Sequence, residues 1–194
     1  MRARAHSPRR LDVAAFCSEG ASLQGALPAG SLPRLAASVL RIGPATDAPH
    51  GSEVERADAA AQWRARGQMR PGQGGEAEFW LNLQADVDVA LQCQRCLEPL
   101  PTRLQVERSI RFVESETQAA RLDEESEEDV MALDTRLDLP ELVEDELILA
   151  LPLVPRHEHC QGAWAGADSP SAPVADDPRP HPFAALAKLR RGPG

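Results

Sequence analysis

The sequence predicts an α+β protein in which an antiparallel β-sheet, a meander, is covered on one face by a helix around residues 138–151. Apolar and polar residues alternate with a period of two over residues 77–93, which is typical of a strand with one buried face. Residues 62–70 and 103–112 show the same alternation, whereas residues 138–151 carry an apolar stripe at helical spacing. We expect flexible acidic and C-terminal segments around this core.

The composition fits a folded protein with an aliphatic core. The chain has 194 residues, of which 42% are hydrophobic and 26% charged, enough for one domain with tails. It has four Phe, three Trp and no Tyr, so Leu, Val and Ala must fill most of the interior. No apolar run is long enough to span a membrane, and the basic N-terminus lacks the apolar stretch of a signal peptide. We therefore expect a cytoplasmic protein.

Before the sheet, the sequence suggests three short elements. Residues 1–10 are rich in arginine and are expected to form a flexible basic arm that precedes a single domain over residues 11–160. Apolar alternation predicts a short strand at residues 21–27. Residues 31–40 (SLPRLAASVL) predict a short helix capped by Ser31.

Each predicted strand of the meander has an inward apolar face. The run at residues 77–93 is longer than most strands, so we expect a bend or hairpin near Ala85–Asp88, with one unbroken, strongly curved strand as the alternative. The inward positions of the three runs are Trp63, Ala65, Gly67 and Met69, then the odd positions from Ala77 to Cys93, then Leu104, Val106, Ile110 and Phe112.

The second half of the chain contains the acidic segment and the covering helix. Residues 114–129 hold eight acidic residues and one Arg, which indicates a solvated segment that is partly helical or disordered. Asp138 and Glu141 have the spacing of a capping box at the start of the helix. Residues 161–182 are typical of a flexible linker, and residues 183–191 predict a short C-terminal helical element.

Two charged residues interrupt the predicted apolar faces. Arg108 occupies an inward position between Val106 and Ile110, and Glu146 lies within the stripe of the covering helix. Because a lone buried charge is costly, we expect Arg108 and Glu146 to form a pair at the sheet–helix interface. The alternative is that the strand end splays and both side chains reach water.

The cysteines and histidines predict a candidate metal site. Cys93 and Cys96 end the central strand, and His157, His159 and Cys160 follow the covering helix by a few residues. Two thiolates from a C-x-x-C pair with a His and another Cys would complete a tetrahedral zinc set. Unmetallated structural thiols and a redox pair are the alternatives. Redox chemistry is disfavoured because catalytic C-x-x-C pairs begin a helix, whereas this pair ends a strand.

The polar face of the sheet predicts a candidate RNA surface. Arginine contacts phosphates, and an exposed indole can stack on an unpaired base. The alternative is an ordinary solvated face on which a loop covers the tryptophan. The residues expected on this face are Arg64, Arg66, Arg70, Trp80, Arg103 and Arg111.

Charge is distributed unevenly along the chain. Residues 1–112 carry 14 arginines and 12 acidic residues, a net charge of +2, whereas residues 113–194 carry a net charge of −11. The acidic half repels nucleic acid, so only a local basic face can bind it. The same half favours a second hypothesis, a module that chaperones a basic ribosomal protein or recruits an assembly factor. Neither a membrane nor DNA is an expected partner.

Three stretches resemble the large ribosomal RNA subunit accumulation protein family, YceD. They are LQCQRCLEPL at residues 91–100, VEDELILALPLVPRHEHC at residues 143–160 and HPFAALAKLR at residues 181–190. The chain departs from the family pattern at His181, where the family usually has Asn. The short interval before Cys160 leaves open whether His157 or His159 takes the role of the family's histidine.

The resemblance implies a bacterial cytosolic protein needed for synthesis, processing or stability of large-subunit (23S) ribosomal RNA, with no established catalysis. The residues agree, because the sequence has no phosphate-binding glycine loop and no nucleophile elbow. A hydrolytic zinc site is also disfavoured, since four protein ligands would close the ion to water. We therefore expect a non-enzymatic biogenesis factor that binds ribosomal RNA, its precursor, or ribosomal assembly proteins.

Overall fold

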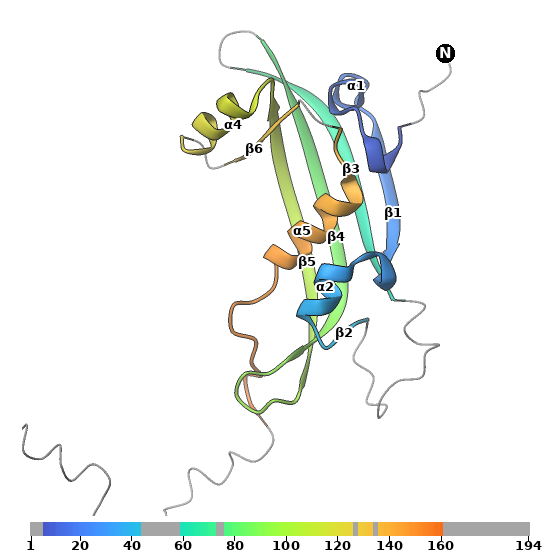
Figure 1. Cartoon of the computed structure of the whole chain (residues 1–194), viewed down its shortest axis with the longest axis vertical. Coiled ribbons are helices and arrows are strands. Elements are labelled where there is room, and N and C mark those ends of the chain that lie inside the picture. The colour runs from blue at the N-terminus through green and yellow to red at the C-terminus, as the bar shows by residue number, and fades with distance from the viewer. Residues whose placement is uncertain (1–5, 44–58, 73–75, 126–127, 134–135, 161–194) are drawn as a thin grey trace, which may run out of the picture. The chain divides into compact units, whose positions relative to one another are not determined.

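The computed structural model describes residues 6–43, 59–72, 76–125, 128–133 and 136–160 (Figure 1). The chain divides into a unit of residues 1–158 and a unit of residues 159–194. The predictions for residues 161–182 and 183–191 lie outside the described residues. Among the described residues, none of the helices has the length and hydrophobicity that a membrane span requires.

A six-stranded sheet forms the body of the first unit, which confirms the α+β prediction. Neighbouring strands follow the order β1-β3-β4-β5-β6, and β2 pairs with β4. All pairings are antiparallel except that of β6, which lies parallel to β5. The strands are β1 (Ser22–Pro28), β2 (Arg41–Ile42), β3 (Ala60–Pro71), β4 (Ala77–Gln92), β5 (Pro99–Val113) and β6 (Asp129–Ala132).

Strand β4 runs unbroken for 16 residues, so the expected hairpin near Ala85–Asp88 is wrong. Asp86, in the middle of that stretch, pairs with Gln62 of β3 and with Gln105 of β5. Both neighbours are long, with 12 residues in β3 and 15 in β5, and they pair with β4 over most of its length. The three strands curve together instead of folding back (Figure 1), as expected of long twisted strands.

Short helices cover the apolar face of the sheet. In Figure 1, α2 and α5 lie in front of the long strands, with α1 near the far end of β3. The helical elements are η1 (Pro8–Arg10), α1 (Val13–Ser18), η2 (Ala29–Ser31), α2 (Pro33–Ser38), α4 (Glu116–Asp123) and α5 (Leu139–Leu149).

Helix α5 begins as the sequence predicts. The Asp138 carboxylate accepts the Glu141 N–H at 3.2 Å, which satisfies one of the unpaired donors of the first turn. Leu139, Val143 and Leu147 are fully buried against the sheet. The helix at residues 31–40 is shorter than expected, because Pro33 occupies its first turn and Ser31 donates to the Pro28 carbonyl at 2.7 Å instead of capping.

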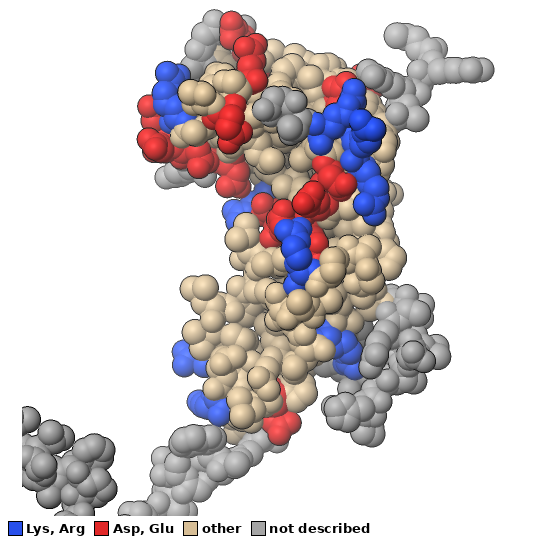
Figure 2. All heavy atoms as spheres, viewed as in Figure 1, with Lys and Arg blue, Asp and Glu red and all other residues tan. Residues whose placement is uncertain are grey.

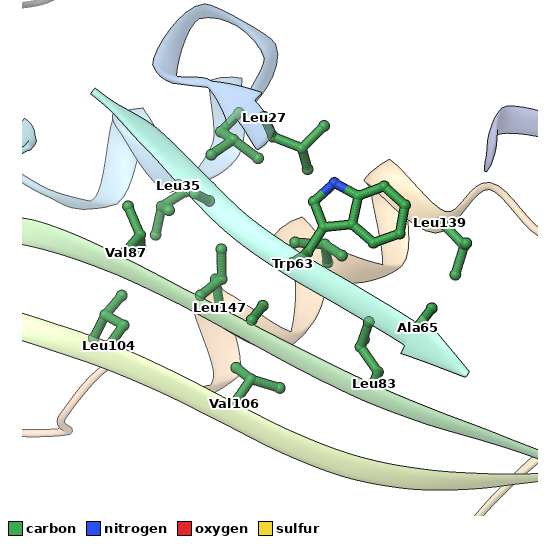
Figure 3. Packing of buried hydrophobic residues seen from close by; sticks show 14 of the residues in the cluster. Leu27, Leu35, Trp63, Ala65, Leu83, Val87, Leu104, Val106, Leu139 and Leu147 are labelled. Carbon is green, nitrogen blue, oxygen red and sulfur yellow. The ribbon is translucent and has the colours of Figure 1, made fainter. Parts of the chain in front are cut away.

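The core lies between the sheet and these helices. Trp63, Ala65, Leu83 and Leu147 point into one layer with residues from β5 and α2 (Figure 3). Met69, expected inward, is 46% exposed and lies near the end of β3.

Helix α2 is attached to α5 by a buried acid that the sequence does not single out. Glu144 is 5% exposed and accepts the backbone N–H groups of Arg34 at 2.7 Å and Leu35 at 3.1 Å. The Arg34 guanidinium pairs with the same carboxylate at 3.2 Å. This carboxylate satisfies unpaired donors at the start of α2, which explains why α5 tolerates a buried charge.

The two segments expected to be flexible contain regular structure where they are described. Residues 116–123 of the acidic segment form α4, whose first turn is capped by Ser115. Figure 2 shows acidic side chains gathered over this helix. In the expected basic arm, residues 8–10 form η1, and the His6 ring packs edge-on against Phe16 with 5.1 Å between centroids.

Candidate metal centre and sheet face

The first half of the candidate metal site is the tight turn between β4 and β5. The Cys93 carbonyl accepts the Leu97 N–H at 2.9 Å, and the Cys93 N–H donates to the Glu98 carbonyl at 3.0 Å. Leu97 adopts a positive φ of 65°, a conformation that non-glycine residues adopt rarely. The turn buries Cys93 completely and leaves Cys96 half-buried.

The second half of the site is the chain that leaves α5. This segment lies against the turn, because the Gln94 N–H donates to the Pro155 carbonyl at 2.8 Å. The Arg95 guanidinium adds two contacts, since its Nη2 donates to the carbonyls of His157 and Glu158, each at 3.2 Å. These contacts hold His157 beside the cysteines.

Four side chains meet at this place. One ligand atom from each of Cys93, Cys96, His157 and Cys160 lies within 4.8 Å of the others. The Cys96 Sγ and the His157 Nδ1 are 3.4 Å apart. A tetrahedral zinc ion with usual bond lengths would place a sulfur and a nitrogen ligand about 3.5 Å apart and two sulfurs about 3.8 Å apart. The cluster could therefore hold a metal ion after small adjustments of its side chains.

The structure selects one of the two candidate histidines. His157 belongs to the cluster, whereas His159 is exposed and does not. The Nε2 of His157 lies 3.2 Å from the Pro99 carbonyl, which can only accept a hydrogen bond. This contact favours the tautomer that carries its proton on Nε2 and leaves the Nδ1 lone pair toward Cys96.

Cys93 is prepared for ligation by its surroundings. Burial raises the pKa of its thiol, but hydrogen bonds from the backbone N–H groups of Cys96, His157 and Arg95 and from the Cys96 side chain lower it. The net result is a pKa of about 5, against an ordinary value of 9.0. These hydrogen bonds favour the thiolate form of Cys93, the form that binds metals.

The polar face of the sheet is hollowed over β1, β3 and β4. The hollow has a volume of about 650 Å³. Arg64 lines it, and the Arg64 guanidinium donates to the Gln24 amide oxygen at 3.2 Å. Arg66, two residues along the same face, is exposed. The hollow is lined by Gln24, Gly25, Ala26, Gln62, Trp63, Arg64, Gln84 and Asp86.

The expectation of an exposed indole on this face is wrong. Trp80 is only 5% exposed. The Arg70 guanidinium lies over the Trp80 ring, 4.1 Å from the ring centroid. The Nε1–H of Trp80 donates to the Glu78 carboxylate at 3.0 Å. Arg70, which is itself half-buried, therefore covers the indole through a cation–π contact, and the ring is not displayed to solvent as predicted.

Two further arginines of the predicted face are neutralised by acids beside them. Arg103 pairs with Asp86 at 2.7 Å and with Asp88 at 3.8 Å. Arg111 pairs with Glu78 at 2.7 Å. Acidic residues alternate on the same face of β4, so the antiparallel register brings Asp88 opposite Arg103. Arg64 and Arg66 are consequently the basic groups that remain exposed without an acidic partner on the described part of this face.

The structure brings Arg108 and Glu146 together. The Arg108 Nε donates to the Glu146 carboxylate at 3.0 Å. The Glu146 side chain is 10% exposed and that of Arg108 is 48% exposed. Arg108 therefore forms the expected pair with Glu146. Its side chain also remains in partial contact with water, as in the alternative prediction.

Comparisons with known proteins agree on one family. Residues 81–190 match the model of the large ribosomal RNA subunit accumulation protein YceD, a stretch that includes all four residues of the metal cluster. The curated protein of that name from Haemophilus influenzae is 40% identical over 110 residues. This match covers 56% of the chain and 63% of the relative, so the chain spans less than two thirds of the relative's length. No solved structure matches. The chain belongs to the YceD family of large ribosomal RNA subunit accumulation proteins.

Proposed function

We propose that this protein is a non-enzymatic, cytoplasmic factor in the synthesis, processing or stability of large-subunit ribosomal RNA, and that it contacts RNA through the hollow around Arg64. Family membership supports the general role. The observation that carries the proposed contact is the exposure of Arg64 and Arg66 on a concave polar face. A concave sheet face can follow a rounded nucleic-acid backbone, and guanidinium groups bind its phosphates.

The chemistry of the lining fits RNA better than an apolar ligand. Gln24, Gln62 and Gln84 supply amide donors and acceptors, which suit ribose 2′-hydroxyls and base edges. The aromatic side chain of the face, Trp80, is buried beneath Arg70, so base stacking on it has no part in this proposal. Recognition here depends on phosphate and hydroxyl contacts.

The test is RNA binding at several salt concentrations, with charge-matched variants. We expect the double variant Arg64→Gln/Arg66→Gln to bind ribosomal RNA fragments more weakly and to reduce the slope of log affinity against log salt by about 1.4, about 0.7 per lost phosphate contact. The control Arg9→Gln/Arg121→Gln makes the same change in net charge on η1 and α4. Equal binding by both double variants would contradict the proposed surface.

A second candidate function rests on the acidic side chains over α4. This surface could shield a basic ribosomal protein or recruit an assembly factor through charge complementarity (Figure 2). A pull-down with RNase treatment separates the two functions. A partner that survives RNase and is lost at high salt favours the protein-binding function, whereas a partner lost with RNase favours the RNA-binding function.

We also propose that the Cys₃His cluster holds a structural zinc ion. Sulfur-rich four-ligand sets suit zinc, and a set of four protein ligands leaves no position for a reactive water. Such a closed site agrees with a non-enzymatic function. A redox role is less consistent with the geometry, because the C-x-x-C pair follows β4 in a tight turn and does not begin a helix.

A further inference from the structure

We propose that Arg95 is the positioning residue that assembles the metal centre, and that His157 binds the ion through Nδ1. This inference rests on the proposed zinc centre and assigns roles to groups that surround it. Arg95 is not a ligand. It acts through the backbone of the segment that carries His157 and Cys160.

The position of Arg95 in both sequence and space carries the argument. It lies between Cys93 and Cys96 in the turn, so its backbone moves with the first two ligands. Its Nη2 reaches across to the carbonyls of His157 and Glu158, both at 3.2 Å. One side chain therefore links the two chain segments that supply the four ligands. These segments are distant in the sequence, since Cys96 and His157 are 61 residues apart.

A second contact supports the same junction without involving a side chain. The Gln94 N–H donates to the Pro155 carbonyl at 2.8 Å. Together with the Arg95 contacts, it places the segment from Pro155 to Glu158 against the turn through groups that are independent of the ion. Binding an ion to a preassembled site avoids the ordering cost of bringing two distant segments together.

The charge of the centre gives Arg95 an additional role. A zinc ion with three thiolates and one neutral imidazole has a net charge of −1. The site is partly buried, since Cys93 is fully covered, and a net charge there is costly without an opposite charge nearby. The Arg95 guanidinium supplies a positive charge next to the ligands. Both carbonyls are bound by the two N–H groups of one nitrogen, Nη2, whose directions are fixed by the planar guanidinium, whereas a lysine ammonium lacks this fixed geometry.

The tautomer of His157 follows from its other contact. Its Nε2 lies 3.2 Å from the Pro99 carbonyl, an acceptor, so the Nε2 proton is used there. Nδ1 then remains as the lone pair, 3.4 Å from the Cys96 sulfur. A hydrogen bond from the second ring nitrogen to a carbonyl is the usual way in which proteins orient a metal-bound histidine.

The experiment measures metal affinity in the full chain. Wild-type protein, purified without chelator, is expected to hold one equivalent of zinc. Arg95→Met is expected to keep that stoichiometry but to bind about 10- to 100-fold more weakly in competition with a chromophoric chelator, the usual effect of removing an outer-shell partner. Arg156→Met is the matched control, because Arg156 is exposed and directly precedes His157. Arg95→Lys, which keeps the charge but not the planar guanidinium that fixes the Nη2 donors, is expected to bind with intermediate affinity.

Cobalt substitution separates a positioning role from ligand loss. The visible spectrum of the cobalt-loaded Arg95→Met protein is expected to match that of wild type, because the four ligands are unchanged, whereas Cys96→Ser should alter or abolish it. Equal zinc affinity in Arg95→Met and Arg156→Met would overturn the role of Arg95 while leaving the centre intact. Wild-type zinc affinity in Arg95→Lys would overturn the proposed role of the carbonyl contacts and would leave the positive charge as the contribution of Arg95. If Arg95→Met does not fold, Arg95→Lys alone decides.

A separate result addresses the centre itself. Wild-type protein that is folded, free of metal and unable to bind cobalt would refute the zinc proposal and this inference together. To test the Nδ1 assignment, nitrogen NMR of zinc-loaded, labelled protein should report His157 protonated at Nε2 and metal-bound at Nδ1. The opposite assignment would overturn that part of the inference.

Discussion

Arg108 of β5 donates its Nε–H to the carboxylate of Glu146 in α5 at 3.0 Å, across the junction between the sheet and its covering helix. Glu146 is 9% exposed in an interface that is otherwise largely aliphatic. Asp129 of β6 lies 4.0 Å from the same guanidinium nitrogen, too far to replace the principal partner. The pair explains how a charged residue can occupy the buried stripe of α5.

Breaking this pair from one side should destabilise the fold. Arg108→Met leaves the Glu146 carboxylate buried without its partner, and we expect the free energy of unfolding to fall by about 1–3 kcal/mol. Arg103→Met removes an exposed pair on the opposite face and should cost less than about 1 kcal/mol. Urea denaturation followed by tryptophan fluorescence measures both. Arg108→Met/Glu146→Leu should recover most of the loss, and a double variant as unstable as the single one would argue against the pair as the cause.

The period-two pattern made much of the fold predictable. Burial of one sheet face requires alternation along each strand, so Trp63, Ala65, Leu83 and Val106 could be assigned to the core from their positions in the alternation alone. The start of α5 was predictable for a similarly local reason, because Asp138 has a capping position and an apolar stripe follows it.

The features that the sequence did not predict depend on contacts between distant residues. The sequence left open whether residues 77–93 bend or form one unbroken strand, because the continuity of β4 depends on pairing with two long neighbours. The burial of Trp80 depends on Arg70 of the neighbouring strand, and the role of Glu144 depends on the start of α2. For the metal site, residue types identified the candidates, but only the fold could choose His157 over His159.

The burial of Trp80 predicts separate effects on stability and on RNA binding. Trp80→Phe removes the indole N–H bond to Glu78 and part of the stacking with Arg70, so stability should fall by about 1–2 kcal/mol. RNA affinity of the folded variant should stay unchanged, because the ring does not reach solvent. Fluorescence anisotropy with labelled RNA measures this. An affinity loss of about 1–3 kcal/mol, the usual contribution of a base stacked on an aromatic ring, would instead indicate that the ring becomes exposed and binds RNA.

Gly67 of β3 is predicted to be intolerant of a side chain. A Cβ atom there would lie 2.7 Å from Phe16 Cδ1, 2.8 Å from the Phe16 carbonyl oxygen and 2.9 Å from Cys17 Cα, so α1 would have to move. We expect Gly67→Ala to lower stability by about 1–3 kcal/mol through overpacking. Gly30→Ala is the control, since a Cβ atom at Gly30 would have no neighbour within 4 Å among the described residues. Calorimetric melting of the two variants decides, and similar melting temperatures would mean that α1 does not pack closely on β3.

Removing the proposed zinc should loosen one end of the molecule and leave the rest of the sheet intact. The amides of Gln94 and Leu97 are hydrogen-bonded within the ligand-bearing turn or to the segment after α5. Without the ion, the four ligands lose their common partner, and the three cysteine thiolates repel one another or become protonated. Hydrogen exchange after chelation should therefore accelerate at residues 93–98, while the β3–β4 pairing around Leu83 keeps its protection.

Restoring zinc, but not magnesium, should restore slow exchange, because magnesium prefers oxygen ligands. Acceleration spread evenly over all strands would show that the ion stabilises the whole fold and not this junction, and unchanged exchange would mean that no ion holds the two segments together.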